Sequence, residues 1–349
     1  MIPKALITGV AGQTGSYLAE VLLDKGYEVH GIVRRSSNLQ RLRIDHLKDS
    51  ISSGTESSFQ LHYADLADTT TIRRIIVALK PDYIYHLAGQ SHVGLSFIIP
   101  ESTCRDITSP TLALLEICKD LESPPRLYHA SSAEVFGKPS EYPQTENTPF
   151  QPVSPYGCAK AFATHICQVY RSAYSLPVSN GILYNHESPR RAENFVTRKL
   201  CLAAASHAHG SLKTVQVGNL DSSRDWGYAL EYAQGIVRIM EYPESTDFLL
   251  ASGRLTTVRE FAQSAYRALG ISLEFIGHGS DEYALNSDTG DILLKVNPQL
   301  YRPIDSASLF GDASKARLLL DWVPEYSASD LAQYMATYEY NSLSFKQPG

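Results

Sequence analysis

A tyrosine and a lysine, Tyr156 and Lys160, stand four positions apart in the segment SPYGCAK. On a helix, positions i and i+4 lie on the same face, so both side chains point the same way. A free tyrosine has a pKa of about 10 and is a poor base at neutral pH, but a nearby ammonium favours the phenolate and lowers that pKa. A hydroxyl at Ser131 or Ser132, after a predicted strand, can hold a substrate oxygen. Together these residues predict acid–base chemistry at that oxygen.

A glycine-rich segment, GVAGQTG, follows the first apolar run of the chain and precedes a predicted helix. Glycines permit a tight turn and let the backbone come close to a pyrophosphate at the helix N-terminus. The position between strand and helix favours a dinucleotide site over a turn without a ligand. The predicted cofactor-binding residues of this loop are Gly9, Gly12, Gln13, Thr14 and Gly15.

The second predicted strand ends in Arg34 and Arg35, where NAD-binding folds usually have an acidic residue for the ribose hydroxyls. Arginines suit a 2′-phosphate, so we predict NADP rather than NAD; the alternative is a solvated basic turn. After the third strand, Asp65 and Leu66 are predicted to contact the adenine. The alternative for Asp65 is that it caps a helix. Residues predicted to pass the cofactor after the fourth strand are Leu87, Ala88, Gly89, Gln90 and Ser91.

The first half of the chain alternates short apolar runs with helix-like segments. The runs are residues 5–8, 29–33, 59–63, 83–87, 127–130 and 178–183. This alternation predicts an α/β fold with a doubly wound, Rossmann-type parallel sheet. Later helices are predicted near residues 195–207, 230–240, 258–269 and 313–338. We predict an NADP-binding domain over residues 1–184 and a smaller mixed α/β substrate lobe over residues 185–349, part of which returns to the sheet.

Composition excludes several other classes of protein. The net charge of −6 argues against nonspecific nucleic-acid or membrane binding. No stretch approaches the roughly 20 apolar residues of a membrane helix. The five cysteines are odd in number and form no C-x-x-C pair, which fits a reduced cytoplasmic protein without a disulfide frame or a cysteine metal site.

With these motifs in place, the chain resembles the extended short-chain dehydrogenases/reductases, and within them it is similar to the GDP-mannose 4,6-dehydratase family. The most specific matching runs are NHESPRR at residues 185–191 and NLDSSRDWG at residues 219–227. Further matches include GIVRRSS, QSHV, VREF and YRP, so the resemblance covers nearly the whole chain. It implies a GDP-sugar substrate and a bound NADP with no net consumption. Residues 35–43 resemble a loop that reaches a neighbouring subunit, which implies a homotetramer or a homodimer.

The resemblance also implies a reaction. The family oxidises its sugar at C4, eliminates water across C5 and C6, and returns the hydride to C6. By the resemblance, Ser132 positions the C4 oxygen, Tyr156 takes its proton and Lys160 lowers the tyrosine pKa while holding the nicotinamide ribose. Tyr156 and Lys160 thus also count as cofactor-binding residues. The elimination needs a base for the C5 proton and an acid for the departing hydroxide, and one carboxylate can serve in both roles. Glu134, two residues after Ser132, is predicted to be that carboxylate; the alternative is a surface glutamate in a loop.

The resemblance assigns His186 and Arg191 to the cofactor. The residues that it assigns to the nucleotide sugar are Ser91, Asn185, Asn194, Lys199, Arg224, Arg302 and Asp305. Arg224 and Arg302 are the natural pyrophosphate pair, because guanidinium groups bind phosphate oxygens bidentately.

The chain departs from the family at a few positions. Ser132 stands for a usual threonine, Ala133 for a serine, and Asp305 for a glutamate. Ser102 replaces a common tyrosine, and Thr14 an aspartate. These changes leave the mechanism intact, and they leave open a relative acting on another GDP-sugar such as a heptose. Two further alternatives are a nucleotide-sugar reductase or epimerase and a non-catalytic binding protein.

Overall fold

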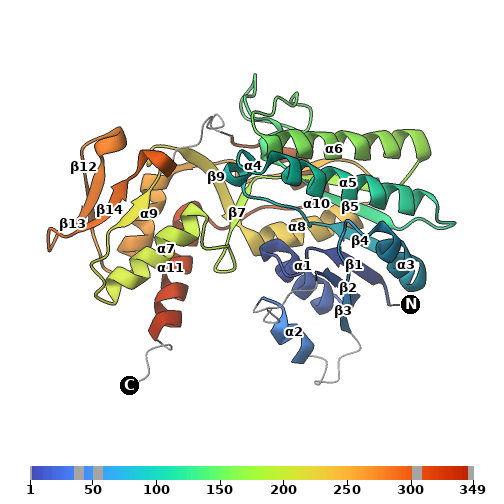
Figure 1. Ribbon diagram of the computed structural model, residues 1–349, viewed down its shortest axis with the longest axis horizontal. Coiled ribbons are helices and arrows are strands. Elements are labelled where there is room, and N and C mark those ends of the chain that lie inside the picture. The colour runs from blue at the N-terminus through green and yellow to red at the C-terminus, as the bar shows by residue number, and fades with distance from the viewer. Residues whose placement is uncertain (1, 35–42, 50–57, 301–308, 345–349) are drawn as a thin grey trace. The chain divides into compact units, whose positions relative to one another are not determined.

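A computed structural model describes residues 2–34, 43–49, 58–300 and 309–344 (Figure 1). The chain forms two compact units. The first comprises Met1–Tyr184, Ala229–Leu250 and Gly311–Val323, and the second comprises Asn185–Tyr228, Ala251–Phe310 and Pro324–Gly349. The chain first passes from one unit to the other between residues 184 and 185. In the part of the chain described here, no helix is both long and apolar enough to cross a membrane.

The first unit is built on a seven-stranded sheet in which every neighbouring pair is parallel. The strand order is β10-β6-β5-β4-β1-β2-β3. The strands are β1 (Lys4–Thr8), β2 (Glu28–Val33), β3 (Phe59–Tyr63), β4 (Tyr83–His86), β5 (Arg126–Ser132), β6 (Val178–Leu183) and β10 (Phe248–Leu250). This sheet confirms the predicted doubly wound fold, and it includes β10 from a later part of the chain.

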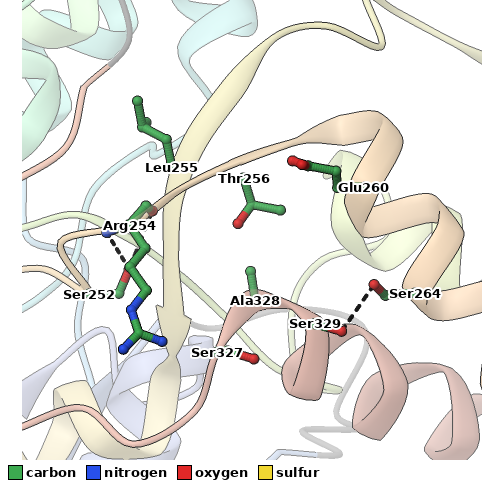
Figure 2. Close-up of a pocket in the computed structure, with 9 residues that line it drawn as sticks. All are labelled: Ser252, Arg254, Leu255, Thr256, Glu260, Ser264, Ser327, Ala328 and Ser329. Carbon is green, nitrogen blue, oxygen red and sulfur yellow. Dashed lines mark hydrogen bonds between the residues drawn. The ribbon is translucent and has the colours of Figure 1, made fainter.

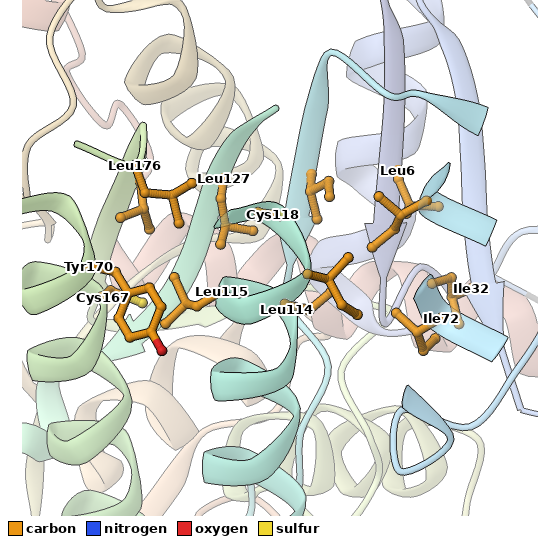
Figure 3. Packing of buried hydrophobic residues seen from close by; sticks show 14 of the residues in the cluster. Leu6, Ile32, Ile72, Leu114, Leu115, Cys118, Leu127, Cys167, Tyr170 and Leu176 are labelled. Carbon is orange, nitrogen blue, oxygen red and sulfur yellow. The ribbon is translucent and has the colours of Figure 1, made fainter. Parts of the chain in front are cut away.

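Helices cover both faces of this sheet. One face packs against α3 (Thr69–Leu79), α5 (Pro100–Lys119) and α6 (Pro155–Tyr174), with an apolar core between (Figure 3). On the other face, α1 (Gln13–Asp24) and α8 (Ala229–Glu241) lie side by side (Figure 1). The remaining helices of this unit are the short α2 (Asp45–Asp49), α4 (Val93–Ser96) and η2 (Ala133–Val135), and α10 (Ser314–Leu320).

The second unit contains two small sheets and three longer helices. One sheet has the order β11-β9-β7 and the other β12-β13-β14-β8. Their strands are β7 (Asn185–Glu187), β8 (Val215–Val217), β9 (Ser223–Tyr228), β11 (Leu255–Thr257), β12 (Leu273–Ile276), β13 (Tyr283–Asn286) and β14 (Ile292–Val296). The helices α7 (Val196–Ala208), α9 (Val258–Arg267) and α11 (Ala328–Ser344) pack against one another. Short turns of helix are η3 (Gly279–Asp281) and η4 (Pro298–Leu300).

The C-terminal helical prediction needs a correction. The single stretch predicted over residues 313–338 is two helices, α10 and α11, which belong to different units. The first ends at Asp321, which has a left-handed φ of 51°, and Pro324 follows shortly after. A left-handed residue and a proline both interrupt the helical hydrogen-bond ladder, so the apolar spacing alone overestimated the length of the helix.

Gly181, in the middle of β6, has no room for a side chain. A Cβ there would lie 2.7 Å from Cζ and 2.8 Å from Cε2 of Tyr128 on β5. We expect Gly181→Ala to lower the free energy of unfolding by about 1–3 kcal/mol, because overpacking displaces a buried ring. Urea unfolding measures this. Ser179→Ala in the same strand is the control, since within the described residues its buried hydroxyl has no hydrogen-bond partner; equal effects of both substitutions would contradict the prediction.

Candidate active site

The glycine loop forms the tight turn that its spacing predicts. Gly9 has φ of 77°, and the amide of Gly12 donates to the carbonyl of Gly9 at 2.9 Å. A Cβ on Gly9 would lie 2.9 Å from the nitrogen of Ala88, and one on Gly15 would lie 2.8 Å from Cα of Val10. The first turn of α1 carries no acidic side chain, so its exposed N–H groups suit a phosphate. The loop therefore fits a dinucleotide.

The other residues predicted near the phosphates lie at the edges of this loop. Gln13 is buried and Thr14 is half-buried, both in the first turn of α1. Arg34 is exposed immediately after β2. Arg35 lies outside the described residues, so its contact with a 2′-phosphate stays a prediction.

Asp65 does not cap a helix. Its carboxylate accepts from the amide of Ala67 at 2.9 Å, within a turn. The cap of α3 is Asp68, which accepts from the amide of Thr71 at 3.0 Å. The helix-cap alternative for Asp65 is therefore wrong, because the helix begins three residues later than that reading requires. Adenine contact by the exposed Asp65 and the half-buried Leu66 stays a prediction.

The segment after β4 runs beside the glycine loop. It contains the predicted residues Leu87, Ala88, Gly89, Gln90 and Ser91. The amide of Ala88 donates to Oγ1 of Thr8 at 3.3 Å, which ties the segment to the end of β1. The Gln90 side chain donates to Oγ1 of Thr103 at 3.2 Å, so it anchors its own loop to α5. Ser91 is exposed.

Tyr156 and Lys160 lie in the first turns of α6, whose start is locally encoded. Ser154 caps the helix by accepting from the amide of Gly157 at 3.0 Å, and Pro155 occupies the first helical position. Both candidate catalytic side chains are buried. Nζ of Lys160 lies 5.9 Å from the centroid of the Tyr156 ring and donates to the carbonyl of Ala130 at 2.8 Å. Burial lowers the pKa of Lys160 to about 8.

The two serines at the end of β5 are not equivalent. Oγ of Ser131 is buried and lies 2.7 Å from Oγ1 of Thr164, beneath α6. Ser132 is half-buried, and its Oγ accepts from the amide of Glu134 at 3.3 Å. Because successive residues of a strand face opposite sides of the sheet, the two hydroxyls point in different directions. The role of Ser132 at the substrate oxygen stays a prediction.

Glu134 is buried rather than displayed on the surface. It lies in the short helix η2 and is 8% exposed. Its carbonyl oxygen would be 2.6 Å from a Cβ placed on Gly157, so this turn packs directly against the start of α6, next to Tyr156. The surface-glutamate alternative is wrong.

The second unit contains most of the residues predicted for the nucleotide sugar. Asn185 and His186 are half-buried in β7, Asn194 is exposed before α7, and Lys199 is half-buried on α7. Desolvation lowers the pKa of Lys199. Arg224, on β9, donates from Nη1 to the carbonyl of Ser223 at 2.7 Å. Arg302 and Asp305 lie outside the described residues.

Arg191 has partners that the sequence analysis did not name. Its Nε lies 3.1 Å from Oε2 of the buried Glu187, which is four residues earlier in the sequence. Its guanidinium lies 3.6 Å from the ring centroid of Phe195. The spacing of Glu187 and Arg191 inside NHESPRR was the signal that could have revealed this pair. Cofactor contact by Arg191 and His186 stays a prediction.

A hollow of about 260 Å³ lies elsewhere in the second unit (Figure 2). It is lined by Ser252, Arg254, Leu255, Thr256, Glu260, Ser264, Ser327, Ala328 and Ser329. None of the sequence-predicted site residues that the structure describes lines it. Within the described residues, no group of three or more His, Cys, Asp or Glu side chains could hold a metal ion.

The parallel sheet, the glycine loop and the buried tyrosine–lysine pair define an extended short-chain dehydrogenase/reductase. The chain belongs to the GDP-mannose 4,6-dehydratase family, because the family model described as "GDP-mannose 4,6 dehydratase" matches residues 6–335. The family and fold predicted from sequence are thus confirmed.

Known relatives agree with this assignment. A GDP-mannose 4,6-dehydratase of Yersinia enterocolitica is 45% identical over 344 residues, covering 95% of this chain and 92% of the relative. A GDP-mannose 4,6 dehydratase of Caenorhabditis elegans is 44% identical over 335 residues, covering 95% and 87%. The fold is similar to the crystal structure of a UDP-glucose 4-epimerase from Bifidobacterium longum in complex with NAD⁺ and UDP. That match has a TM-score of 0.78 at 24% identity and covers 97% of this chain and 98% of the epimerase.

Proposed function

We propose that this protein is a GDP-mannose 4,6-dehydratase, which converts GDP-mannose to GDP-4-keto-6-deoxy-mannose with loss of water. The observation that carries the proposal is the burial of Glu134 in a turn packed against the start of α6. An epimerase of this superfamily has no need of a carboxylate at that position. The curated names of relatives in the same family support the same substrate.

Each of the four candidate catalytic residues has a distinct role in the proposed reaction. Ser132 hydrogen-bonds to the C4 oxygen of the sugar, and Tyr156 takes the proton of that hydroxyl. The ammonium of Lys160, anchored on a backbone carbonyl, favours the phenolate of Tyr156. Once C4 is a ketone, the neighbouring C5 hydrogen is acidic. Glu134 removes it and gives that proton to the hydroxide that leaves C6. The proton that Tyr156 took from the C4 hydroxyl goes to C5 when the hydride reaches C6.

The cofactor of this proposal is NADP, held by the glycine loop and the N-terminus of α1. Bound there, NADP would supply reversible hydride transfer, without net consumption. A nicotinamide cofactor is supported by the fit of the loop and by the similar epimerase, which was solved with NAD⁺. The choice of NADP rests on Arg34 and Arg35 after β2.

Arg34→Ala is expected to weaken NADP binding by about tenfold to a hundredfold, because a charge-assisted bond to the 2′-phosphate is lost. NAD binding should change little, since NAD lacks that phosphate. Titration calorimetry with both cofactors measures the two dissociation constants. Arg73→Ala is the control, because Arg73 is exposed on α3 and pairs with Asp120 at 3.0 Å. An equal loss of affinity for NAD and NADP in Arg34→Ala would argue against the assignment.

We assign the GDP-sugar to a set drawn mainly from the second unit. The set is Ser91, Asn185, Asn194, Lys199, Arg224, Arg302 and Asp305. Lys199 and Arg224 supply cations of the kind that a pyrophosphate requires. The assignment of His186 and Arg191 to the cofactor, like that of this set, rests on the resemblance to the family.

The decisive experiment is mass spectrometry of the products formed from a panel of GDP-, dTDP-, CDP- and UDP-sugars with NADP. GDP-mannose should give a 4-keto-6-deoxy product with no net reduction of the cofactor. Unchanged GDP-mannose, an epimer of unchanged mass, or turnover only with a keto-sugar and stoichiometric NADPH would each refute the proposal. Preference for a GDP-heptose would keep the reaction class and change the sugar.

We further propose that the protein works in the cytoplasm as a homodimer or as a homotetramer built as a dimer of dimers. The support is the resemblance of residues 35–43 to a family loop that reaches a neighbouring subunit, together with the absence of any cysteine pairing motif in the sequence. Light scattering coupled to size exclusion gives the subunit number directly.

A further inference from the structure

A row of polar side chains crosses the apolar face of the first unit's sheet. Its members are Thr8, His86, His129 and Asn180, which pair in register across β1, β4, β5 and β6. The row two residues earlier on the same strands is apolar and consists of Leu6, Ile84, Leu127 and Val178. Figure 3 labels Leu6 and Leu127 of this row. Residues two apart on a strand share a face, so the polar row also lies under α5 and α6. Each of its members is at most 3% exposed.

Hydrogen bonds fix the protonation of His129. Nδ2 of Asn180 donates to Oδ1 of Asp247 at 2.9 Å and to the carbonyl of Thr164 at 3.3 Å. Both partners are acceptors here, so the amide must present its Oδ1 to Nδ1 of His129, 2.9 Å away. An acceptor at that position requires a proton on Nδ1 of His129.

The other nitrogen of His129 is therefore an acceptor with a lone pair. Burial, the charge of Lys160 and the neighbouring His86 hold the pKa of His129 well below its usual range, so the ring is neutral. Within the described residues, Nε2 of His129 is buried and has no hydrogen-bond partner. His86 differs, because both of its nitrogens have partners: Oγ1 of Thr8 at 2.8 Å and Oγ1 of Thr111 at 3.3 Å.

Lys160 lies beside this row. Its Nζ donates to the carbonyl of Ala130, the residue that follows His129, and its charge lowers the pKa of both imidazoles. In the described part of the chain, no carboxylate forms an ion pair with Lys160. A buried ammonium without a counter-ion must be stabilised by dipoles and lone pairs.

Apart from Tyr156, whose ring centroid lies 5.9 Å from Nζ on the same helix, the other titratable groups around Lys160 and His129 leave this role to the imidazole. His86 faces them from β4, and burial lowers its pKa to about 3, so it is neutral. Cys167 faces them from α6, and burial raises the pKa of its thiol, so it carries no charge either. Asp247 is committed to Arg171 at 2.8 Å and to Gln168 at 2.7 Å, on the far side of Asn180.

We propose that His129 is a positioning residue for Lys160. Because Asn180 fixes the Nδ1–H tautomer of His129, the lone pair of His129 is on Nε2. This lone pair is the negative end of the neutral ring, and it faces the Lys160 ammonium. His129 touches neither substrate nor cofactor and acts through Lys160, and through it on Tyr156. This inference rests on the proposed function, in which the Lys160 ammonium favours the Tyr156 phenolate. Without the lone pair, Lys160 loses its proton at a lower pH, and activity at alkaline pH falls with it.

The first test needs no turnover. Nitrogen NMR of the histidine-labelled full-length protein should show His129 as the Nδ1–H tautomer, without protonation between about pH 5 and pH 8, where ordinary histidines titrate. The signal is assigned by its loss in His129→Gln. An Nε2–H tautomer, or a titration of His129 in that range, would overturn the proposal whether or not GDP-mannose is the substrate.

The second test is the pH dependence of kcat/KM with the substrate that the product panel identifies. The alkaline limb of the wild type should lie near the pKa of Lys160, about 8. In His129→Leu that limb should move down by about one pH unit, with kcat falling about fivefold at the old midpoint and KM nearly unchanged. His129→Gln should restore it, since an amide can donate to Asn180 and still offer an oxygen to Lys160.

Ser179→Ala is the matched control. Ser179 is buried on β6 next to Asn180 and faces the opposite side of the sheet, so the limb should not move. Equal losses in His129→Leu and His129→Gln without a shifted limb would show a merely structural role and overturn the proposal. A wild type that turns over nothing in the panel refutes the proposed function instead, and the NMR titration then decides alone. The same titration decides if His129→Leu does not fold.

Discussion

Tyr156→Phe is expected to reduce kcat by about a thousandfold or more, because the phenol that exchanges a proton with the C4 oxygen is lost. NADP binding should stay within about twofold, since the ring remains and Lys160 keeps its bond to a backbone carbonyl. The measurements are steady-state kinetics with product detection by mass spectrometry, and calorimetric titration of the cofactor.

Tyr174→Phe is the control for this substitution. Tyr174 is at the other end of the same helix and is 55% exposed, so removal of its hydroxyl should leave kcat unchanged. Retention of wild-type turnover in Tyr156→Phe would remove this residue from the mechanism. A parallel loss of NADP affinity would show that the substitution acts on the binding of the cofactor rather than on the chemical step.

Glu134→Gln is expected to abolish water loss, again by about a thousandfold, while sparing oxidation at C4. An amide of the same size can neither remove the C5 proton nor protonate the hydroxide at C6. Exchange of the C5 hydrogen with deuterated solvent should therefore disappear together with the 4-keto-6-deoxy product. Mass spectrometry of the sugar recovered from deuterium oxide measures both quantities in one experiment.

Glu101→Gln serves as the control for this second substitution. The side chain of Glu101 is 93% exposed at the start of α5, and its loss should change neither exchange nor product formation. Formation of product by Glu134→Gln at the wild-type rate would show that another group performs the elimination. Residual exchange without product would instead separate removal of the C5 proton from protonation of the leaving hydroxide.

Much of the fold could be predicted because its signals are local. The six longer strands of the first unit coincide with short runs rich in apolar residues, and the glycine loop lies directly between a strand and a helix. β10 could not be placed this way, because three residues, Phe248–Leu250, carry too little pattern to identify their partner strand. The break at Asp321 was missed for a similar reason: a left-handed residue other than glycine leaves little trace in a hydropathy pattern.

The site shows the same division between local and tertiary information. Tyr156 and Lys160 could be paired from their spacing alone. The start of α6 could be located from the neighbouring residues Ser154 and Pro155, which are typical of a helix N-terminus. The row that joins Thr8 to Asn180 could not be found, because strand register depends on how distant segments pair. The bond between Ser131 and Thr164 of α6 is likewise a tertiary contact, which the spacing of residues in the sequence could not reveal.

The first unit has a consequence for synthesis, because its last strand is made late. β6 is buried along its whole length, yet its outer partner β10 follows only after Asn185–Tyr228 and α8 have been translated. While the ribosome is still producing those segments, the nascent sheet has an unpaired apolar edge. Chains that stall or are truncated near residue 184 should therefore aggregate unless a chaperone holds them until Phe248–Leu250 emerges.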